Sequence, residues 1–229
     1  MKKDKQMRQH SKALATAMAV IAGVAMTSPA MAAPGDILIK IRGGYALRTG
    51  SSAVTVNVGD TPVTTRARGA VSGEASLTFF MTRHLAAELT LGGAPYDLED
   101  SKGRSLVSAG VITPTAMLQY HPMPDSKTLR PYVGIGLSYA NFYSEKAGEI
   151  LTDRHVFPPI SYSASLKGAL APVAQIGADI PIDDQFYINL DAKYLGANTK
   201  LTLEQGSDSQ TVSHRMRSIV LGAGVGFRF

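Results

Sequence analysis

The chain has 229 residues, a formal net charge of +5, no cysteine and no tryptophan. The absence of cysteine excludes a disulfide framework, and the length suits a single domain. Five of the 23 basic residues fall within the first 12 positions, so the basic character of the chain does not indicate a nucleic-acid partner.

The first 32 residues predict an export signal. Basic residues dominate positions 1–12, an uncharged apolar run follows at 13–26, and small residues stand at Ala30 and Ala32. These are the three parts of a secretory signal peptide, with cleavage expected after Ala32. The apolar run is too short for the ~20 residues that a membrane-spanning helix needs. The mature chain would keep 18 basic and 17 acidic residues, a net charge of +1.

From residue 33 onward, apolar residues alternate with polar or small ones, which is the period of a β-strand. In FYINLDAKYL, for example, Ile188 and Leu190 alternate with Asn189. Eight segments of this kind are predicted strands, at residues 37–45, 74–82, 84–91, 107–121, 131–143, 163–180, 186–195 and 218–229. Pro114 and Pro172 fall inside two of them and predict a bulge or a local break, because proline cannot donate to a strand ladder.

The connections between these segments alternate between long and short, including long loops at 47–72 and 196–214, as they do in bacterial outer-membrane barrels. No apolar run after the export signal approaches the roughly 18 residues of a membrane-spanning helix. A chain without such a helix can cross lipid as a closed barrel, which satisfies every backbone polar group. The alternation alone also fits a small soluble barrel with its apolar face inside.

The polar face of the predicted strands favours the membrane barrel. It is rich in glycine and alanine and carries charges of both signs, which suits a narrow lumen where they can pair. The charges expected in this lumen are Lys40, Arg42, Glu74, Glu88, Lys167, Asp179, Asp191, Lys193 and Arg228. They are interpreted as a structural ladder that fills the barrel or, alternatively, as a polar gate. We predict an all-β fold, an eight-stranded antiparallel transmembrane β-barrel over residues 33–229.

The final segment, LGAGVGFRF, resembles the last strand of outer-membrane barrels, which commonly ends on Phe. That resemblance implies that Phe227 and Phe229 form a signal read by the barrel-assembly machinery. Further segments resemble successive strands of the OmpW family of outer-membrane proteins. They are ITPTAMLQYH (112–121) for the fourth strand, LRPYVGIGLSYANFY (129–143) for the fifth, SLKGALAPVAQIGADI (165–180) for the sixth and YINLDAKYL (187–195) for the seventh.

This resemblance implies a narrow, largely apolar channel for passive uptake of small hydrophobic molecules, and it does not imply an enzyme. The chain departs from the family at Leu170, where family members carry Trp, and the alternation places Leu170 on the lipid face. With no Trp available, Tyr and Phe must supply the aromatic belt at the membrane interfaces. The residues expected in that belt are Tyr45, Tyr120, Tyr139, Phe142, Tyr143, Tyr187, Tyr194, Phe227 and Phe229.

A channel in so small a barrel needs an unusual route, because eight strands leave a lumen barely wide enough for side chains. We expect an apolar funnel in the outer loops, with Phe157 and Ile160 at its mouth, and a sideways exit near Pro114 or Pro172. Outer-membrane lipid, lipopolysaccharide, the barrel-assembly machinery and small hydrophobic permeants are the expected partners.

Two alternatives remain open at this point. One is a structural or adhesive barrel with a closed lumen. The other is a lipid-modifying barrel enzyme that uses His155 or His214 with Asp153, Ser213 or Glu145 nearby in the sequence. The histidines are far apart and lack metal-ligand spacing, so neither a metal site nor a cofactor is expected.

Overall fold

The computed structural model describes residues 33–49, 53–58, 61–152, 162–205 and 208–229. Its strands are β1 (Ile37–Arg48), β2 (Ala53–Val58), β3 (Thr61–Ala67), β4 (Ala70–Phe80), β5 (Leu85–Asp100), β6 (Ser105–Tyr120), β7 (Arg130–Ala147), β8 (Ser163–Leu166), β9 (Ala169–Pro181), β10 (Phe186–Gln205) and β11 (Asp208–Arg228). A short 3-10 helix, η1, covers Glu149–Leu151. No helix among the described residues is both long and apolar enough to cross a membrane. The predicted export signal at 1–32 lies outside these residues.

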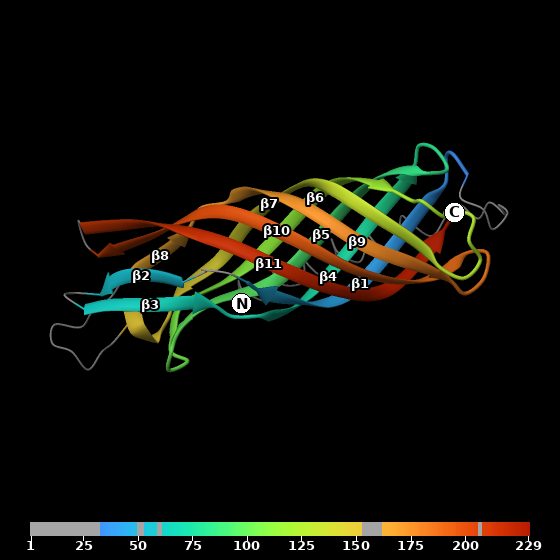
Figure 1. The fold of residues 1–229 in the computed structure, drawn as a ribbon. Helices are drawn as coiled ribbons and strands as arrows, with labels where there is room; N and C mark the ends of the chain where they lie inside the picture. The colour runs from blue at the N-terminus through green and yellow to red at the C-terminus, as the bar shows by residue number, and fades with distance from the viewer. Residues whose placement is uncertain (1–32, 50–52, 59–60, 153–161, 206–207) are drawn as a thin grey trace, which may run out of the picture. The chain divides into compact units, whose positions relative to one another are not determined.

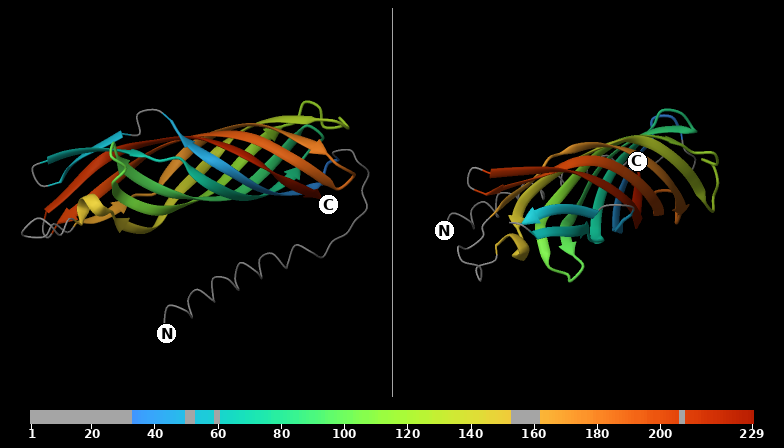
Figure 2. Two further views of the ribbon diagram at one scale, coloured as in Figure 1. Left: turned by 90° about the horizontal axis from the view of Figure 1, so that it is seen from below. Right: turned by 60° about the vertical axis from the view of Figure 1, so that its left-hand side comes forward.

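Eight strands close into a ring, which confirms the predicted eight-stranded antiparallel barrel (Figures 1 and 2). The order around the ring is β1, β4, β5, β6, β7, β9, β10 and β11. The ring closes where β11 pairs with β1, from Leu38 opposite Arg228 to Arg48 opposite Ser218. Because the first and last ring strands pair, the ring has no open sheet edge, and this is the condition for a sheet in lipid.

The outer face of the barrel carries an apolar band. Ile41, Leu89, Ile135 and Ile176 are all more than half exposed there, and Leu170 is 66% exposed, as predicted for the lipid face. Aromatic side chains border the band, with Tyr45, Tyr139, Tyr143 and Tyr194 toward one end and Phe79, Tyr120 and Phe186 toward the other. An apolar band between aromatic girdles is the lipid-facing surface of an outer-membrane barrel.

Two residues predicted for the aromatic belt point inward instead. Tyr187 and Phe142 are 2% and 8% exposed. Each occupies the inward position of its strand, and the outward position beside it is filled by Phe186 or Tyr143. The prediction was wrong for Tyr187 and Phe142 because alternation along the strand decides which side an aromatic ring faces.

At one end of the barrel, much of the sequence predicted as long loop is strand. β10 and β11 pair in one register from Phe186 opposite Phe227 to Gln205 opposite Asp208. The prediction of a loop at 196–214 was therefore wrong. β2 and β3 form a hairpin within the predicted loop 47–72, and β5 continues to Asp100. Figure 1 shows these extensions gathered at its left-hand side.

The extensions escaped prediction because their alternation is inverted relative to the rest of the strand. Beyond Tyr194, the outward residues of β10 include the exposed Asn198 and Lys200. The inward residues include Leu201 and Leu203, which are 0% and 2% exposed. Apolar side chains turn inward here because the outer surface now faces water instead of lipid.

Tight turns close the opposite end. In one, Thr82 Oγ1 accepts hydrogen bonds from the backbone N–H groups of His84 and Leu85. In another, Asp183 Oδ1 accepts from the N–H groups of Gln185 at 2.8 Å and Phe186 at 2.7 Å. These two donors hold the pKa of Asp183 below its usual value. Short turns on one rim and long extensions on the other place the turns on the periplasmic side.

A proline marks a local break between β6 and β7. Their pairing stops at Ile112 opposite Asn141 and resumes at Thr115 opposite Ser138 without a change of register. Pro114 lies within this gap and faces outward. The break predicted at Pro114 is therefore present, and it is not a bulge.

Pro172 borders a wider irregularity. The ladder to β7 continues through Pro172, which lies opposite Leu137. The ladder to β10 ends at Val173 and resumes at Leu166, where seven steps along β8 and β9 face six along β10. The extra residue is a bulge. Because of this bulge, the inward-facing side chains have even residue numbers in β8 and odd residue numbers in β9.

Candidate functional site in the barrel interior

Charged side chains from several strands meet inside the barrel. Arg42 lies at their centre, with Nη2 3.1 Å from Glu88 Oε1, Nε 3.3 Å from Glu74 Oε2 and Nη1 3.4 Å from Asp191 Oδ2. The side chains of Arg42, Glu88 and Asp191 are at most 1% exposed. We refer to the charged network as Lys40, Arg42, Glu74, Glu88, Asp179, Asp191 and Lys193.

Two lysines extend the charged network on either side of Arg42. Lys40 Nζ lies 3.7 Å from Asp179 Oδ2. Lys193 Nζ lies 3.2 Å from Asp191 Oδ2 and also contacts Glu74. Each cation of the network therefore has a carboxylate beside it, which offsets the cost of removing both charges from water.

Amide side chains complete the charged network, whose four carboxylates outnumber its three cations. The amide nitrogens donate from Gln119 to Glu88, from Gln175 to Asp191 at 2.7 Å and from Asn189 to Asp179 at 2.7 Å. Because the amides come from β6, β9 and β10, the polar contacts span the lumen from wall to wall. A buried network of this kind is favourable when its members are paired, and it becomes costly when one is removed.

The structure places eight of the nine predicted lumen charges on the inner face of the barrel, seven of them in the charged network and Arg228 nearer the turns. Lys167 is the exception. It is exposed and lies between β8 and β9, where its backbone carbonyl accepts a hydrogen bond from Thr199 Oγ1. The prediction for Lys167 was wrong because the bulge beside Pro172 reverses the alternation there.

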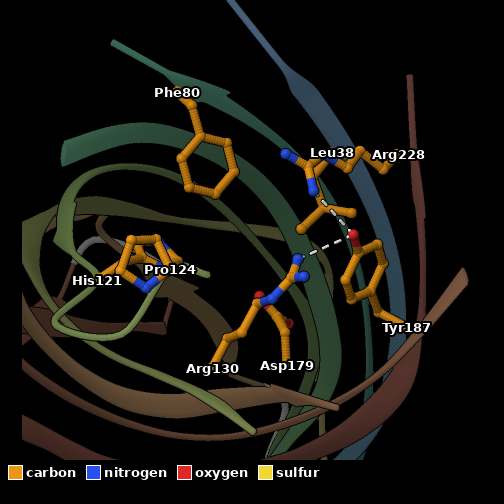
Figure 3. Close-up of a pocket in the computed structure, with 8 residues that line it drawn as sticks. All are labelled: Leu38, Phe80, His121, Pro124, Arg130, Asp179, Tyr187 and Arg228. Carbon is orange, nitrogen blue, oxygen red and sulfur yellow. Dashed lines mark hydrogen bonds between the residues drawn. The ribbon is translucent and has the colours of Figure 1, made fainter. Parts of the chain in front are cut away.

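A second polar group fills the barrel near the tight turns. Arg130 and Arg228 each donate a hydrogen bond of 3.0 Å to the hydroxyl of Tyr187 (Figure 3). Arg228 also pairs with Asp36. His121 lines the same small pocket. These contacts tie β7, β10 and β11 together across the periplasmic end.

Above the charged network, the interior is apolar. Its buried side chains include Tyr96, Leu98, Leu106, Val107, Val111, Phe142, Leu151, Leu166, Leu201, Leu203 and Met216. The rings of Tyr96 and Phe142 meet edge to face, with centroids 5.2 Å apart. The Tyr96 hydroxyl forms a hydrogen bond with Nε2 of His214. The interior thus has a polar half toward the periplasm and an apolar half toward the outside.

A cavity lies where the two halves meet, and we call it the junction chamber. Its enclosed space is about 50 Å³, and it opens on one side. Glu74 and Lys193 of the charged network line one part of it, and Val111, Leu195 and Met216 line another. The chamber therefore offers a largely apolar wall beside charged groups, which is typical of a small-molecule site.

Arg48 also lines the junction chamber, and the sequence analysis missed it. The predicted first strand ended at residue 45, whereas β1 continues to Arg48. Arg48 lies six residues after Arg42, so the same alternation turns both inward. Extending the alternation by three residues would have found it.

Several residues considered from the sequence do not form a site in the structure. Phe157, Ile160, Asp153 and His155 lie outside the described residues. The others are Ser213, which is exposed, His214, which is 1% exposed and faces Tyr96, and Glu145, whose carboxylate accepts a hydrogen bond from the backbone N–H of Leu166. Ser213 and His214 are adjacent in a strand and so face opposite sides of the sheet. No group of three or more potential metal ligands occurs among the described residues.

Comparison with known proteins agrees with this architecture. A protein of Sinorhizobium fredii named uncharacterized outer-membrane protein y4mB is 30% identical over 163 residues, which are 68% of this chain and 65% of that protein. The chain thus spans slightly less than two thirds of that relative. Outer membrane protein W of Vibrio cholerae is 25% identical over 221 residues, which cover 91% of this chain and 98% of that protein.

Solved structures share the fold. The outer membrane protein OprG of Pseudomonas aeruginosa superposes with a TM-score of 0.67 at 19% identity, over 88% of this chain and 99% of that one. The outer membrane protein AlkL, solved in lipid bilayers, gives a TM-score of 0.64 at 18% identity, over 91% and 97%. The model of the OmpW family matches residues 33–229. This chain is therefore an outer-membrane β-barrel protein that belongs to the OmpW family.

Proposed function

We propose that this barrel lets small hydrophobic molecules cross the outer membrane passively. The proposal rests on the division of the barrel interior into an apolar half and a polar half. An apolar upper half can take up a hydrophobic molecule from the outside, and the junction chamber gives it a place to stop. The charged network below offers no favourable path, because a hydrophobic molecule there would have to displace buried ion pairs.

The route we propose leaves the barrel sideways. Thr113 lines the junction chamber and lies directly before Pro114, in the gap of the β6–β7 ladder. A wall without ladder pairs opens at lower cost than an intact one. A molecule that leaves at this gap enters the apolar band of lipid and avoids the charged network.

A disulfide across the gap tests this route, since the chain has no cysteine of its own. Thr113→Cys and Ala140→Cys, on β6 and β7, continue the register on both sides of the gap. We expect oxidation of this pair to lower uptake of radiolabelled naphthalene to the level of cells without the barrel, and reduction to restore it. Phe157→Asp with Ile160→Asp tests the proposed mouth in the same assay.

The matched control is a disulfide elsewhere in the same barrel. Thr202 and Thr211 face each other across β10 and β11, with their hydroxyl oxygens 3.0 Å apart on the exposed surface. Oxidation of Thr202→Cys with Thr211→Cys should leave uptake unchanged. Uptake that is equal with and without the barrel, at equal surface expression, would contradict a channel altogether.

That result would favour a structural or adhesive barrel with a closed lumen. One observation supports this second candidate, because the contacts of the charged network span the lumen from wall to wall. Catalysis has weaker support, since Ser213 and His214 face opposite sides of the sheet. We further propose export by the signal at 1–32, assembly by the barrel-assembly machinery and contact of the outer end with lipopolysaccharide.

A further inference from the structure

Arg48 is the basis of a further inference. It lines the junction chamber, where its Nη1 donates a 2.7 Å hydrogen bond to Ser218 Oγ. Its guanidinium carbon lies 4.9 Å from the centroid of the Tyr96 ring. These two contacts hold the guanidinium in place. Nε and Nη2 are buried and have no hydrogen-bond partner among the described residues.

The electrostatic setting of Arg48 differs from that of four other cations inside the barrel. Lys40, Arg42, Lys193 and Arg228 each lie within 4.0 Å of a carboxylate. No ion pair links Arg48 to a carboxylate in the part of the chain that the structure describes. An arginine stays protonated at any physiological pH, so Arg48 keeps its positive charge although no carboxylate of the described residues pairs with it.

The network carboxylate that lines the junction chamber is already paired with other cations. Glu74 also lines the chamber, but it pairs with Arg42 and Lys193. Arg48, Lys193 and Glu74 together give the chamber lining two positive charges and one negative charge. The chamber therefore favours an anion, and the place for it is beside Arg48.

The edge of Arg48 that has no partner among the described residues specifies the kind of anion. Nε and Nη2 form one side of the guanidinium fork, which matches the two oxygens of a carboxylate. Ser72 Oγ, which lines the same chamber, is buried and without a hydrogen-bond partner among the described residues. The remaining wall, including Val111, Leu195 and Met216, is apolar.

We infer that the junction chamber binds a small carboxylate with an apolar body, its carboxylate on Arg48 and its body against the apolar wall. This inference deepens the proposed function by naming a class of occupant, and it rests on that proposal for the route by which the occupant arrives. Benzoate, a small aromatic monocarboxylate, represents this class of occupant in the tests below.

Binding to the folded barrel in lipid nanodiscs tests the inference. Benzoate and its neutral analogue benzamide are titrated calorimetrically, with empty nanodiscs as the blank. We expect saturable benzoate binding, and about tenfold weaker binding or none for benzamide, because a charge-assisted bidentate pair forms with benzoate alone. Equal binding of the two probes, or no benzoate binding, would overturn the inference.

Two variants of Arg48 and one control variant test whether the Arg48 guanidinium is responsible for benzoate binding. Arg48→Met should weaken benzoate binding about tenfold or more and leave any benzamide binding unchanged. Arg48→Lys keeps the charge without the fork and should give intermediate affinity. Arg68→Met removes an exposed arginine that pairs with Glu99, and it should bind benzoate as the unaltered barrel does. Unchanged benzoate binding in Arg48→Met would contradict the inference.

Folding and function are separated by two further readouts. A heat-modifiable gel band shows that each variant has closed its barrel, and if Arg48→Met fails to fold, the benzoate–benzamide contrast and Arg48→Lys still decide. Naphthalene uptake reports the proposed function separately. If benzoate binds through Arg48 but naphthalene uptake does not depend on the barrel, the binding site is supported and the proposed channel is contradicted.

Discussion

The guanidinium of Arg42 in β1 lies 3.1 Å from the carboxylate of Glu88 in β5, and both side chains are at most 1% exposed. The two strands are not neighbours in the ring, since β4 lies between them. The pair therefore bridges the inner face of β4 and links β1 to β5.

Loss of one partner of this pair should destabilise the barrel strongly. Arg42→Met leaves Glu88, Glu74 and Asp191 around an apolar side chain, and removing one partner of a buried ion pair costs about 3–5 kcal/mol. We expect a corresponding fall in the free energy of unfolding, measured by guanidinium denaturation in lipid vesicles. The control Arg68→Met removes an exposed pair with Glu99 and should cost about 0–1 kcal/mol. Equal losses of unfolding free energy in the two variants would show that Arg42 contributes no more to stability than an exposed arginine does.

Two glycines on neighbouring strands should respond in opposite ways to the same substitution. A Cβ on Gly224 of β11 would lie 2.0 Å from the backbone oxygen of Ile41, whereas a Cβ on Gly43 of β1 would meet nothing within 4 Å. Gly224→Ala must push strands apart, and overpacking costs about 1–3 kcal/mol. Gly43→Ala should be neutral or stabilising by up to about 1 kcal/mol. Denaturation midpoints of the two variants, compared side by side, check this; a tolerated Gly224→Ala would contradict it.

Assembly should depend on the aromatic residues of the final strand. Phe227 packs edge to face on Phe186, with ring centroids 5.0 Å apart. Phe229→Asp should lower the amount of barrel in the outer membrane and raise degradation in the periplasm. Phe227→Leu keeps the apolar contact and should reduce assembly less. Fractionation and immunoblotting measure both, and normal membrane levels of Phe229→Asp would show that this residue serves packing alone.

Alternation in the sequence predicted the fold because lipid and a narrow lumen impose opposite demands on the two faces of each strand. Lys40, Arg42 and Glu88 obey that rule, because each takes an inward position in the membrane-spanning part of its strand. The alternation rule failed where the environment of the outer surface changes. Above the apolar band, water replaces lipid and the inward face becomes apolar, as at Leu201, so the sequence pattern predicts loops where the structure has strand extensions.

The pairing inside the barrel could not be derived from the sequence for a different reason. Alternation states which side chains point inward, but the partner of Arg42 depends on the register and tilt of strands far apart in the chain. The junction chamber depends on the same geometry. The inward position of Arg48 follows from the alternation, whereas the sequence could not show that Nε and Nη2 lack a partner among the described residues, because this depends on the positions of Ser218 and Tyr96.

Two lysines that looked equivalent in the sequence should now behave differently. Lys193 is 3% exposed and pairs with Glu74 and Asp191, whereas Lys167 is exposed beside the bulge between β8 and β9. Lys193→Met should lower the free energy of unfolding by about 3–5 kcal/mol, because two buried carboxylates lose a shared partner. Lys167→Met removes the same charge from the surface and should change stability by less than about 0.5 kcal/mol. Parallel unfolding curves in lipid vesicles give the comparison, with a heat-modifiable gel band to show that each barrel has closed. A loss in Lys167→Met as large as that in Lys193→Met would contradict the exposed position of Lys167.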